Sequence, residues 1–276
     1  MRLLALFPLI LSLPLPVLAS GCSLNQVGIV PGSDASTSDV IVPEAGPPPT
    51  GWCATTGTGH DFCADFDTSL RGTEPGAWCG AIANGVGCGA TELGGTVTRD
   101  TALIASKPAS ASAQTMLGLA QSQAFLTREF PGSLHPLKLA FDVQLDAFGI
   151  GSGATLAAIT LETFMGSSHG VSLVATPPGD AGPNAGLVVV ESKLSGPPTQ
   201  TALLLSIPPS KFVRVELVIG IAPNTVTVTV DGASSSILTI DAPGSADGRA
   251  LQLGLEATPA DAWAAHFDDV TFDFSK

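Results

Sequence analysis

Apolar and polar residues alternate along much of this chain with a period of two, which is typical of β-strands with one buried face. The clearest case is "PLKLAFDVQLDA", residues 136–147. Apolar residues from Leu137 to Leu145 occupy every second position, and polar residues such as Asp142 lie between them. The segment therefore predicts a strand that buries one face and exposes the other.

The same alternation returns at short intervals from about residue 92 to the end of the chain. Residues 211–221 and 225–232 repeat it, and Asp231-Gly232 is typical of a hairpin turn. No segment of helical length keeps a 3.6-residue apolar stripe with caps. About a dozen strands joined by short turns predict one all-β domain over residues 52–276, a two-sheet antiparallel jelly-roll sandwich.

Composition supports this fold class and limits the partners. Glycine (31) and proline (22) are abundant, and hydrophobic residues make up 45% of the 276 residues, so short strands, tight turns and a sizeable core are all expected. The formal net charge of -13 would repel a phosphate backbone, so we expect no nucleic-acid partner. The sequence leaves the oligomeric state open.

Residues 1–21 have the features of a secretory signal peptide. One arginine precedes an uncharged apolar run that is too short and too interrupted by proline for a membrane span. The following "LASGC" resembles a bacterial lipoprotein signal, which implies a lipid on Cys22, although Ala19 stands where leucine is usual. The alternative is ordinary cleavage that leaves Cys22 a free thiol. Ser23 favours the outer membrane if the cell is Gram-negative.

Residues 22–51 predict a disordered tether between the lipid and the folded domain. They are rich in proline, glycine, serine and threonine and keep no sustained periodicity. We therefore expect an exported protein, anchored to the envelope through its lipid alone and displayed on a flexible stalk.

Export changes the interpretation of the other cysteines, which are Cys53, Cys63, Cys79 and Cys88. An even number in an oxidising compartment predicts two disulfides. Three pairings are possible, and we favour the sequential one because it closes two short loops, each stabilising by about 2–3 kcal/mol. A zinc site is the alternative, but the spacing lacks the short Cys-x-x-Cys units that such sites favour.

Several motifs together resemble concanavalin A-like (laminin G-like) jelly-roll domains. They are "FCADFD" near the start, Trp78, the pair "KFVRVELVI" and "TVTVTVDG", then "LQLGLEA" and a final "HFDDVTFDF", in that order over roughly residues 60–276. Phe212 stands where tryptophan is often found. The resemblance implies that the first and last strands lie side by side, so "HDFCADFD" (60–67) becomes the opening strand rather than a catalytic cluster.

The resemblance also implies one structural Ca²⁺ where these two strands meet. Asp268 would supply a carboxylate, and Asp67 or nearby backbone would supply further oxygens, which suits the six to eight hard ligands of calcium. The alternative is that Asp268 and Asp269 cap backbone groups or face water.

Two short motifs suggest enzymes but lack the required context. "GSSHG" (166–170) matches a nucleophile elbow with Ser168, yet a β-branched segment follows instead of a helix. "GIGSGA" (149–154) loosely matches a dinucleotide-binding loop, yet no βαβ rhythm surrounds it, so we expect a flexible loop.

Glycosidase or lyase activity has weak support, because Glu162, Glu191 and Glu216 are isolated acids on separate strands. We expect the three tryptophans to pack rather than to bind sugar. A transition-metal site shared by His60 and His266 is not expected, because the two would lie near opposite ends of the strand pair.

The leading hypothesis is a non-catalytic surface binding or adhesion lipoprotein, with a polysaccharide or surface glycan as its ligand. The first alternative is an envelope structural or protein-interaction module without a small ligand. The second is a diverged glycoside hydrolase or polysaccharide lyase.

Overall fold

The computed structural model describes residues 51–55, 59–72, 76–79, 87–106, 108–131, 136–163, 168–179, 182–193, 196–241 and 246–275. They all fall within one compact unit, Pro47–Lys276. The predictions for the signal peptide, for Cys22 and for nearly all of the tether fall outside the described residues. Within the described part, no helix is long and apolar enough to cross a membrane.

In these residues one sheet, here called sheet A, contains nine strands. Its main path is β13-β12-β11-β6-β16-β4-β3, and beside this path β1 pairs with β16 and β14 with β12. The strands are β1 Phe62–Ala64, β3 Gly95–Asp100, β4 Ser110–Thr115, β6 Leu137–Ala147, β11 Val213–Ile221, β12 Asn224–Val230, β13 Ala233–Ser234, β14 Leu238–Thr239 and β16 Ala264–Asp273.

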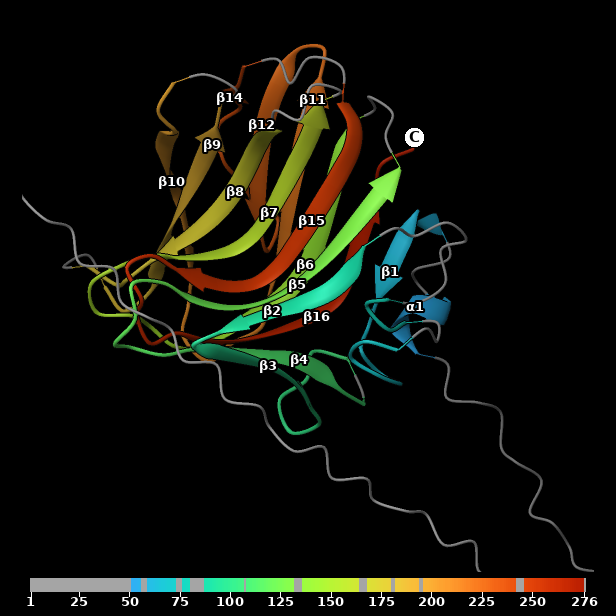
Figure 1. Ribbon diagram of the computed structural model, residues 1–276, viewed down its shortest axis with the longest axis vertical. Coiled ribbons are helices and arrows are strands. Elements are labelled where there is room, and N and C mark those ends of the chain that lie inside the picture. Colours follow the sequence, from blue (N-terminus) through green and yellow to red (C-terminus); the bar gives the residue numbers. More distant parts are fainter. Residues whose placement is uncertain are drawn as a thin grey trace, which may run out of the picture. The chain divides into compact units, whose positions relative to one another are not determined.

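The second sheet, here called sheet B, contains seven strands within the described residues, in the order β10-β9-β8-β7-β15-β5-β2. They are β2 Cys88–Leu93, β5 Ser122–Pro131, β7 Ala154–Thr163, β8 Ser168–Thr176, β9 Ala185–Ser192, β10 Thr199–Ile207 and β15 Ala246–Ala257. All pairings between these strands are antiparallel. A short helix, α1 (Trp52–Thr55), precedes β1. Figure 1 shows the two sheets packed face to face, with sheet B toward the viewer.

The core lies between the sheets and is built by the predicted alternation. In β6, the alternate apolar residues from Leu137 to Leu145 are fully buried. Trp78 and Trp263 are buried as well, as expected of packing residues. Each such side chain stabilises the fold by about 1.5–3 kcal/mol relative to an exposed one. The prediction of an all-β, two-sheet antiparallel sandwich is confirmed.

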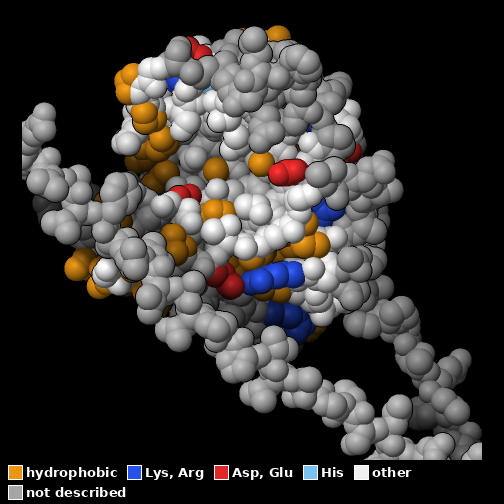
Figure 2. Space-filling model, in the orientation of Figure 1, with side chains coloured by type: hydrophobic (Ala, Val, Ile, Leu, Met, Phe, Trp, Pro, Cys, Tyr) orange, Lys and Arg blue, Asp and Glu red, His pale blue; other side chains and the backbone are white. Residues whose placement is uncertain are grey.

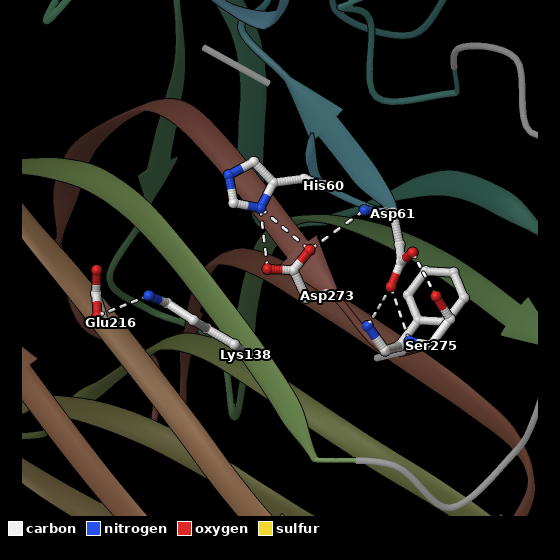
Figure 3. A network of polar contacts seen from close by, with 7 residues as sticks. His60, Asp61, Lys138, Glu216, Asp273 and Ser275 are labelled. Carbon is white, nitrogen blue, oxygen red and sulfur yellow. Dashed lines mark hydrogen bonds and ion pairs between the residues drawn. The ribbon is translucent and has the colours of Figure 1, made fainter. Parts of the chain in front are cut away.

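The first and last strands lie side by side, as the resemblance implies. β1 pairs with β16 in the register Phe62↔Phe272. His60 Nδ1 lies 2.9 Å from Asp273 Oδ2, and the Asp61 carboxylate accepts hydrogen bonds of 2.7 Å from the backbone N–H groups of Phe274 and Ser275 (Figure 3). The two ends of the domain are therefore fixed to each other.

The opening strand is shorter than "HDFCADFD" predicts. Regular pairing ends at Ala64, and Phe66 has a positive φ of 57°. Asp65 is buried at 2% exposure, although strict alternation would place it on the outer face, and Phe66 stays in the core. A period-two pattern cannot foresee this, because the ladder ends at Ala64 and the N–H groups of Asp65 and Phe66 both donate to the carbonyl oxygen of Gly76, so strict alternation no longer holds.

The cysteines pair sequentially, as predicted. Disulfides join Cys53 to Cys63 and Cys79 to Cys88, each with a Cα–Cα distance of 5.7 Å. The first attaches α1 to β1, and the second ends at the first residue of β2. Both lie in the part of the chain that precedes the main sandwich strands.

The two turn motifs also have structural roles. Asp231 and Gly232 have φ angles of 46° and 83° and join β12 to β13, as the Asp-Gly pair predicts. The "GIGSGA" loop between β6 and β7 is held in place rather than flexible: the N–H groups of Gly151 and Ser152 donate to Asp261 Oδ2 at 2.8 and 3.0 Å. Its resemblance to a dinucleotide motif therefore reflects a cradle for a buried carboxylate.

Candidate functional site

A groove of about 540 Å³ lies on the outer face of sheet B. β7, β8, β9, β10 and β15 form it, and its polar lining includes Thr155, Ser172, Thr176, Ser192, Gln200 and Glu256. Figure 2 views the molecule from this side, and the face is mostly uncharged polar side chains and backbone, drawn in white. The groove therefore presents hydroxyl, amide and carboxylate groups together with the side chains of Val174, Val188 and Val190.

Short outward-facing side chains keep this face hollow. In the β8–β9 ladder, Ser172 lies opposite Val190 and Val174 opposite Val188, and their chain neighbours face the core. Small or β-branched residues at these positions leave room above the sheet that long side chains would fill. Gly153 closes one end: a Cβ there would lie 2.8 Å from the carbonyl oxygen of Ala175, so the loop can pack only with glycine.

Glu256 is fixed at the groove by three glutamines. Gln121 and Gln123 donate through their Nε2 atoms to Glu256 Oε1 at 2.5 and 3.0 Å, and Gln252 donates to Oε2 at 3.1 Å. The strand register brings them together, since Gln123 is the β5 partner of Glu256. We refer to these four residues as the Glu256 cluster. Sequence reasoning missed it, although "QSQ" and "QLGLE" are visible signals of polar residues at outward positions.

A second polar region lies where β1 meets β16. Asp65 and Asp67 both face Gly51, because a Cβ built on Gly51 would lie 2.7 Å from Asp65 Oδ2 and 2.8 Å from Asp67 Oδ2. Asp65 Oδ2 accepts the Cys53 N–H at 2.8 Å, whereas Asp67 Oδ2 is buried without a partner of normal hydrogen-bond geometry. Among the carboxylate oxygens of Asp67 and Asp268, the predicted calcium pair, Asp67 Oδ2 is the one without a hydrogen bond of normal geometry.

Asp268 has a different environment. It is fully buried, and its Oδ2 accepts the backbone N–H groups of Ala105 and Ser106 at 3.1 and 3.0 Å. Its Oδ1 accepts the Asp269 N–H at 2.9 Å, and Asp269 Oδ1 accepts the Ser106 hydroxyl at 2.6 Å. The two aspartates therefore hold the loop between β3 and β4, which is the backbone-capping role that the sequence left open.

The electrostatics of this region are unusual. Burial raises the pKa of Asp268 from its ordinary value of 3.8 to about 8 and that of Asp269 to about 7. Burial, and then the neighbouring Asp65 charge, raises the pKa of Asp67 to about 6. A medium of low polarity disfavours the charged form of each carboxyl. A bound cation would reverse this preference.

The residues fit calcium only in part. Among the residues that the structure describes, no group of three or more His, Cys, Asp or Glu side chains is placed to hold a metal ion. Asp65 and Asp67 would supply carboxylate oxygens to a Ca²⁺ ion, and backbone carbonyls would have to supply the others. Asp268 would support the loop beside it.

Three histidines bind separate carboxylates. His60 contacts Asp273, and His266 lies between Asp146 and Asp100, at 2.5 and 2.9 Å. His60 and His266 thus have different partners. His169 Nε2 contacts Glu191 at 2.9 Å in a buried pair.

The other candidates are also apart from one another. Glu191 is buried in sheet B, whereas Glu216 lies on sheet A and pairs with Lys138 at 3.1 Å (Figure 3). Ser168 begins β8 of an antiparallel β7–β8 pair, so the helix that a nucleophile elbow needs is replaced by a strand. Trp52 is half-buried and carries the guanidinium of Arg214, 5.4 Å from its ring centroid.

No family model matches the chain, and no curated protein matches its sequence. Solved structures do resemble it in fold. The cellulose-induced protein Cip1 has a TM-score of 0.50 at 15% identity, covering 78% of this chain and 98% of that one. A PL7 alginate lyase from Zobellia galactanivorans has a TM-score of 0.43 at 10% identity, covering 59% of this chain and 76% of the lyase.

An alginate lyase from Pseudomonas aeruginosa has a TM-score of 0.47 at 12% identity, covering 60% of this chain and 83% of the lyase. At these identities the likeness concerns the fold alone. Together with the two antiparallel sheets and the pairing of the first and last strands, it shows that this chain has the concanavalin A-like jelly-roll fold that its motifs resemble.

Proposed function

We propose that this chain is an exported, lipid-anchored envelope protein that binds carbohydrate in the groove of sheet B without catalysing a reaction. The observation that carries the proposal is the lining of the groove, which offers the hydroxyls of Thr155, Ser172 and Ser192, the amide of Gln200 and the carboxylate of Glu256. Sugar hydroxyls both donate and accept hydrogen bonds, so such a surface suits a chain of sugars.

The likeness to Cip1, a protein named for its induction by cellulose, agrees with a carbohydrate ligand. Because a fold does not determine a function, the proposal rests on the groove rather than on this likeness.

Hydrolysis is not part of the proposal, because the described lining of the groove does not match what a glycoside hydrolase requires. A glycoside hydrolase needs two carboxyl groups about 5–9 Å apart across the sugar. Glu256 is the acidic residue among the described residues of the groove, and three glutamine donors already occupy its two oxygens. A carboxylate held in this way suits recognition better than proton transfer.

The alternative is a module that contacts other envelope proteins and binds no small ligand. One observation favours it: on the edge strand β10, Leu204 is fully exposed. An apolar residue on an open strand edge is a common contact point between proteins.

A glycan array separates the two functions. The full-length protein, purified in mild detergent, is expected to be retained by at least one class of immobilised plant, bacterial or algal polysaccharide. Silence across all of them would contradict carbohydrate binding and favour the protein-interaction module.

The anchor has its own test. If Cys22 carries the lipid, the Cys22→Ala variant is expected to move from the membrane fraction to the aqueous fraction after cell lysis, because a lipid chain is the proposed attachment. A variant that stays with the membrane would refute lipid anchoring at this cysteine.

One structural Ca²⁺ ion beside Asp67 is a further part of the proposal. Its support is the buried, unpartnered Oδ2 atom of Asp67 and the adjacent Asp65 carboxylate. Hard oxygens of this kind are the ligands that calcium prefers.

A further inference from the structure

The groove of sheet B carries a negative charge at a defined place. Its described lining consists of hydroxyl, amide and small aliphatic groups together with the carboxylate of Glu256. A ligand that extends across the groove to β15 lies beside this carboxylate. The charge of the ligand therefore matters here more than at an uncharged sugar-binding surface.

The Glu256 cluster keeps that charge in place. The three amide N–H donors come from β15 itself (Gln252), from β5 (Gln123) and from the loop before β5 (Gln121), so the carboxylate is held from two sides. Oε1 accepts two of these hydrogen bonds and Oε2 accepts one, so Oε2 keeps acceptor capacity for a sugar hydroxyl, and the carbonyl oxygens of the glutamine amides add further acceptors.

A uronic acid and a neutral hexose differ at this point. The neutral sugar has a hydroxymethyl group, which can donate to the carboxylate or to an amide carbonyl. The uronate has a carboxylate in place of the hydroxymethyl group. That carboxylate cannot donate a hydrogen bond to Glu256 or to an amide carbonyl, and the charge of Glu256 repels it. Like-charge contact is a common way for a site to reject the wrong partner.

We infer that the groove selects neutral polysaccharides and rejects polyuronates, with Glu256 as the residue that determines this specificity. The inference rests on the proposed function, because it concerns the ligand of the same groove. It assigns the groove an uncharged class of ligand.

The test compares polysaccharides that differ only in the oxidation of C6. Mannan is compared with polymannuronate, and soluble cellulose with its C6-oxidised form, at an ionic strength of about 0.15 M so that long-range repulsion is screened. Affinity electrophoresis of the full-length protein is expected to show binding to a neutral member that is at least about tenfold tighter than to its oxidised counterpart.

Two variants link this preference to the cluster. Glu256→Gln removes the charge of this side chain and nearly keeps its shape. The ratio of the affinity for the neutral polymer to that for the oxidised polymer is expected to fall to about threefold or less. Thr155→Lys, on the β7 position that pairs with Glu256, places a cation in the groove and is expected to raise polyuronate affinity. Glu216→Gln is the matched control, because it makes the same change on sheet A and should keep the wild-type preference.

The outcomes are distinguishable. Equal or tighter binding of the oxidised polymers by the wild-type protein would overturn the charge selection and leave carbohydrate binding intact. A preference for neutral polymers that survives in both Glu256→Gln and Thr155→Lys would overturn the role of Glu256. Failure to bind either member of both pairs, together with a silent array, would overturn the proposed function itself.

Discussion

The buried aspartates at the junction of β1 and β16 control how the stability of this protein depends on pH. In the unfolded chain their pKa is near the ordinary value of 3.8, whereas in the folded chain it is about 6 for Asp67, about 7 for Asp269 and about 8 for Asp268. Between these values the folded state binds more protons than the unfolded state. The free energy of unfolding therefore decreases as the pH rises through this window.

We therefore expect the melting temperature in the presence of a chelator to fall as the pH rises through 6 to 8. Asp268→Asn, which removes the charge, should flatten this slope. Asp231→Asn in the β12–β13 turn is the control and should leave the slope unchanged. A melting temperature that does not depend on pH in this range would show that these carboxyls ionise freely.

Added calcium should oppose the loss of stability at higher pH. Near the upper end of this pH range, added Ca²⁺ is expected to raise the melting temperature, because a bound cation compensates the charge of the Asp67 carboxylate. Calorimetry with and without chelator measures the effect. An unchanged melting temperature would refute the calcium site.

The positions and roles of single residues were the hardest features to predict. The sequence pointed to Asp268 and Asp67 through a resemblance, and the structure places both at the junction, but the free acceptor atom belongs to Asp67. Two consecutive aspartates, Asp268 and Asp269, would put one side chain outside in a regular strand. Both are buried because the β16–β6 register shifts between Asp268 and Thr271 and Asp269 has a φ of 49°.

Strands were more predictable, because alternation depends only on which side chains face the core. β6, β11 and β12 follow the predicted segments closely. β1 is the exception, since it has three residues and depends on tertiary contacts for its position. One of these is the disulfide between Cys53 and Cys63.

We expect removal of this disulfide, by Cys53→Ser with Cys63→Ser, to lower the free energy of unfolding by about 2–3 kcal/mol. The loop it closes is short, with a sequence separation of 10, and β1 has few ladder bonds of its own. Urea denaturation measures the loss. A double variant as stable as the wild type would contradict a structural role.

The groove can be recognised only from the arrangement of the strands in the whole molecule. Glu256, Gln121 and Gln123 come from parts of the chain more than a hundred residues apart, with sequence separations of 135 and 133 for the two hydrogen-bonded pairs. The pattern along one strand predicts which residues face outward but not which strands become neighbours. The fold class was therefore predictable from the sequence, whereas the groove and its charge required the strand order.

The central claim is that carbohydrate binds on the outer face of sheet B, and filling the groove tests it most directly. Ser172→Phe places a ring in the middle of the groove, and Thr227→Phe places the same kind of bulk on the outer face of sheet A. Binding of the polysaccharide retained on the array should be lost in Ser172→Phe and kept in Thr227→Phe, with both variants folded by circular dichroism. Undiminished binding by the Ser172→Phe protein would contradict the account.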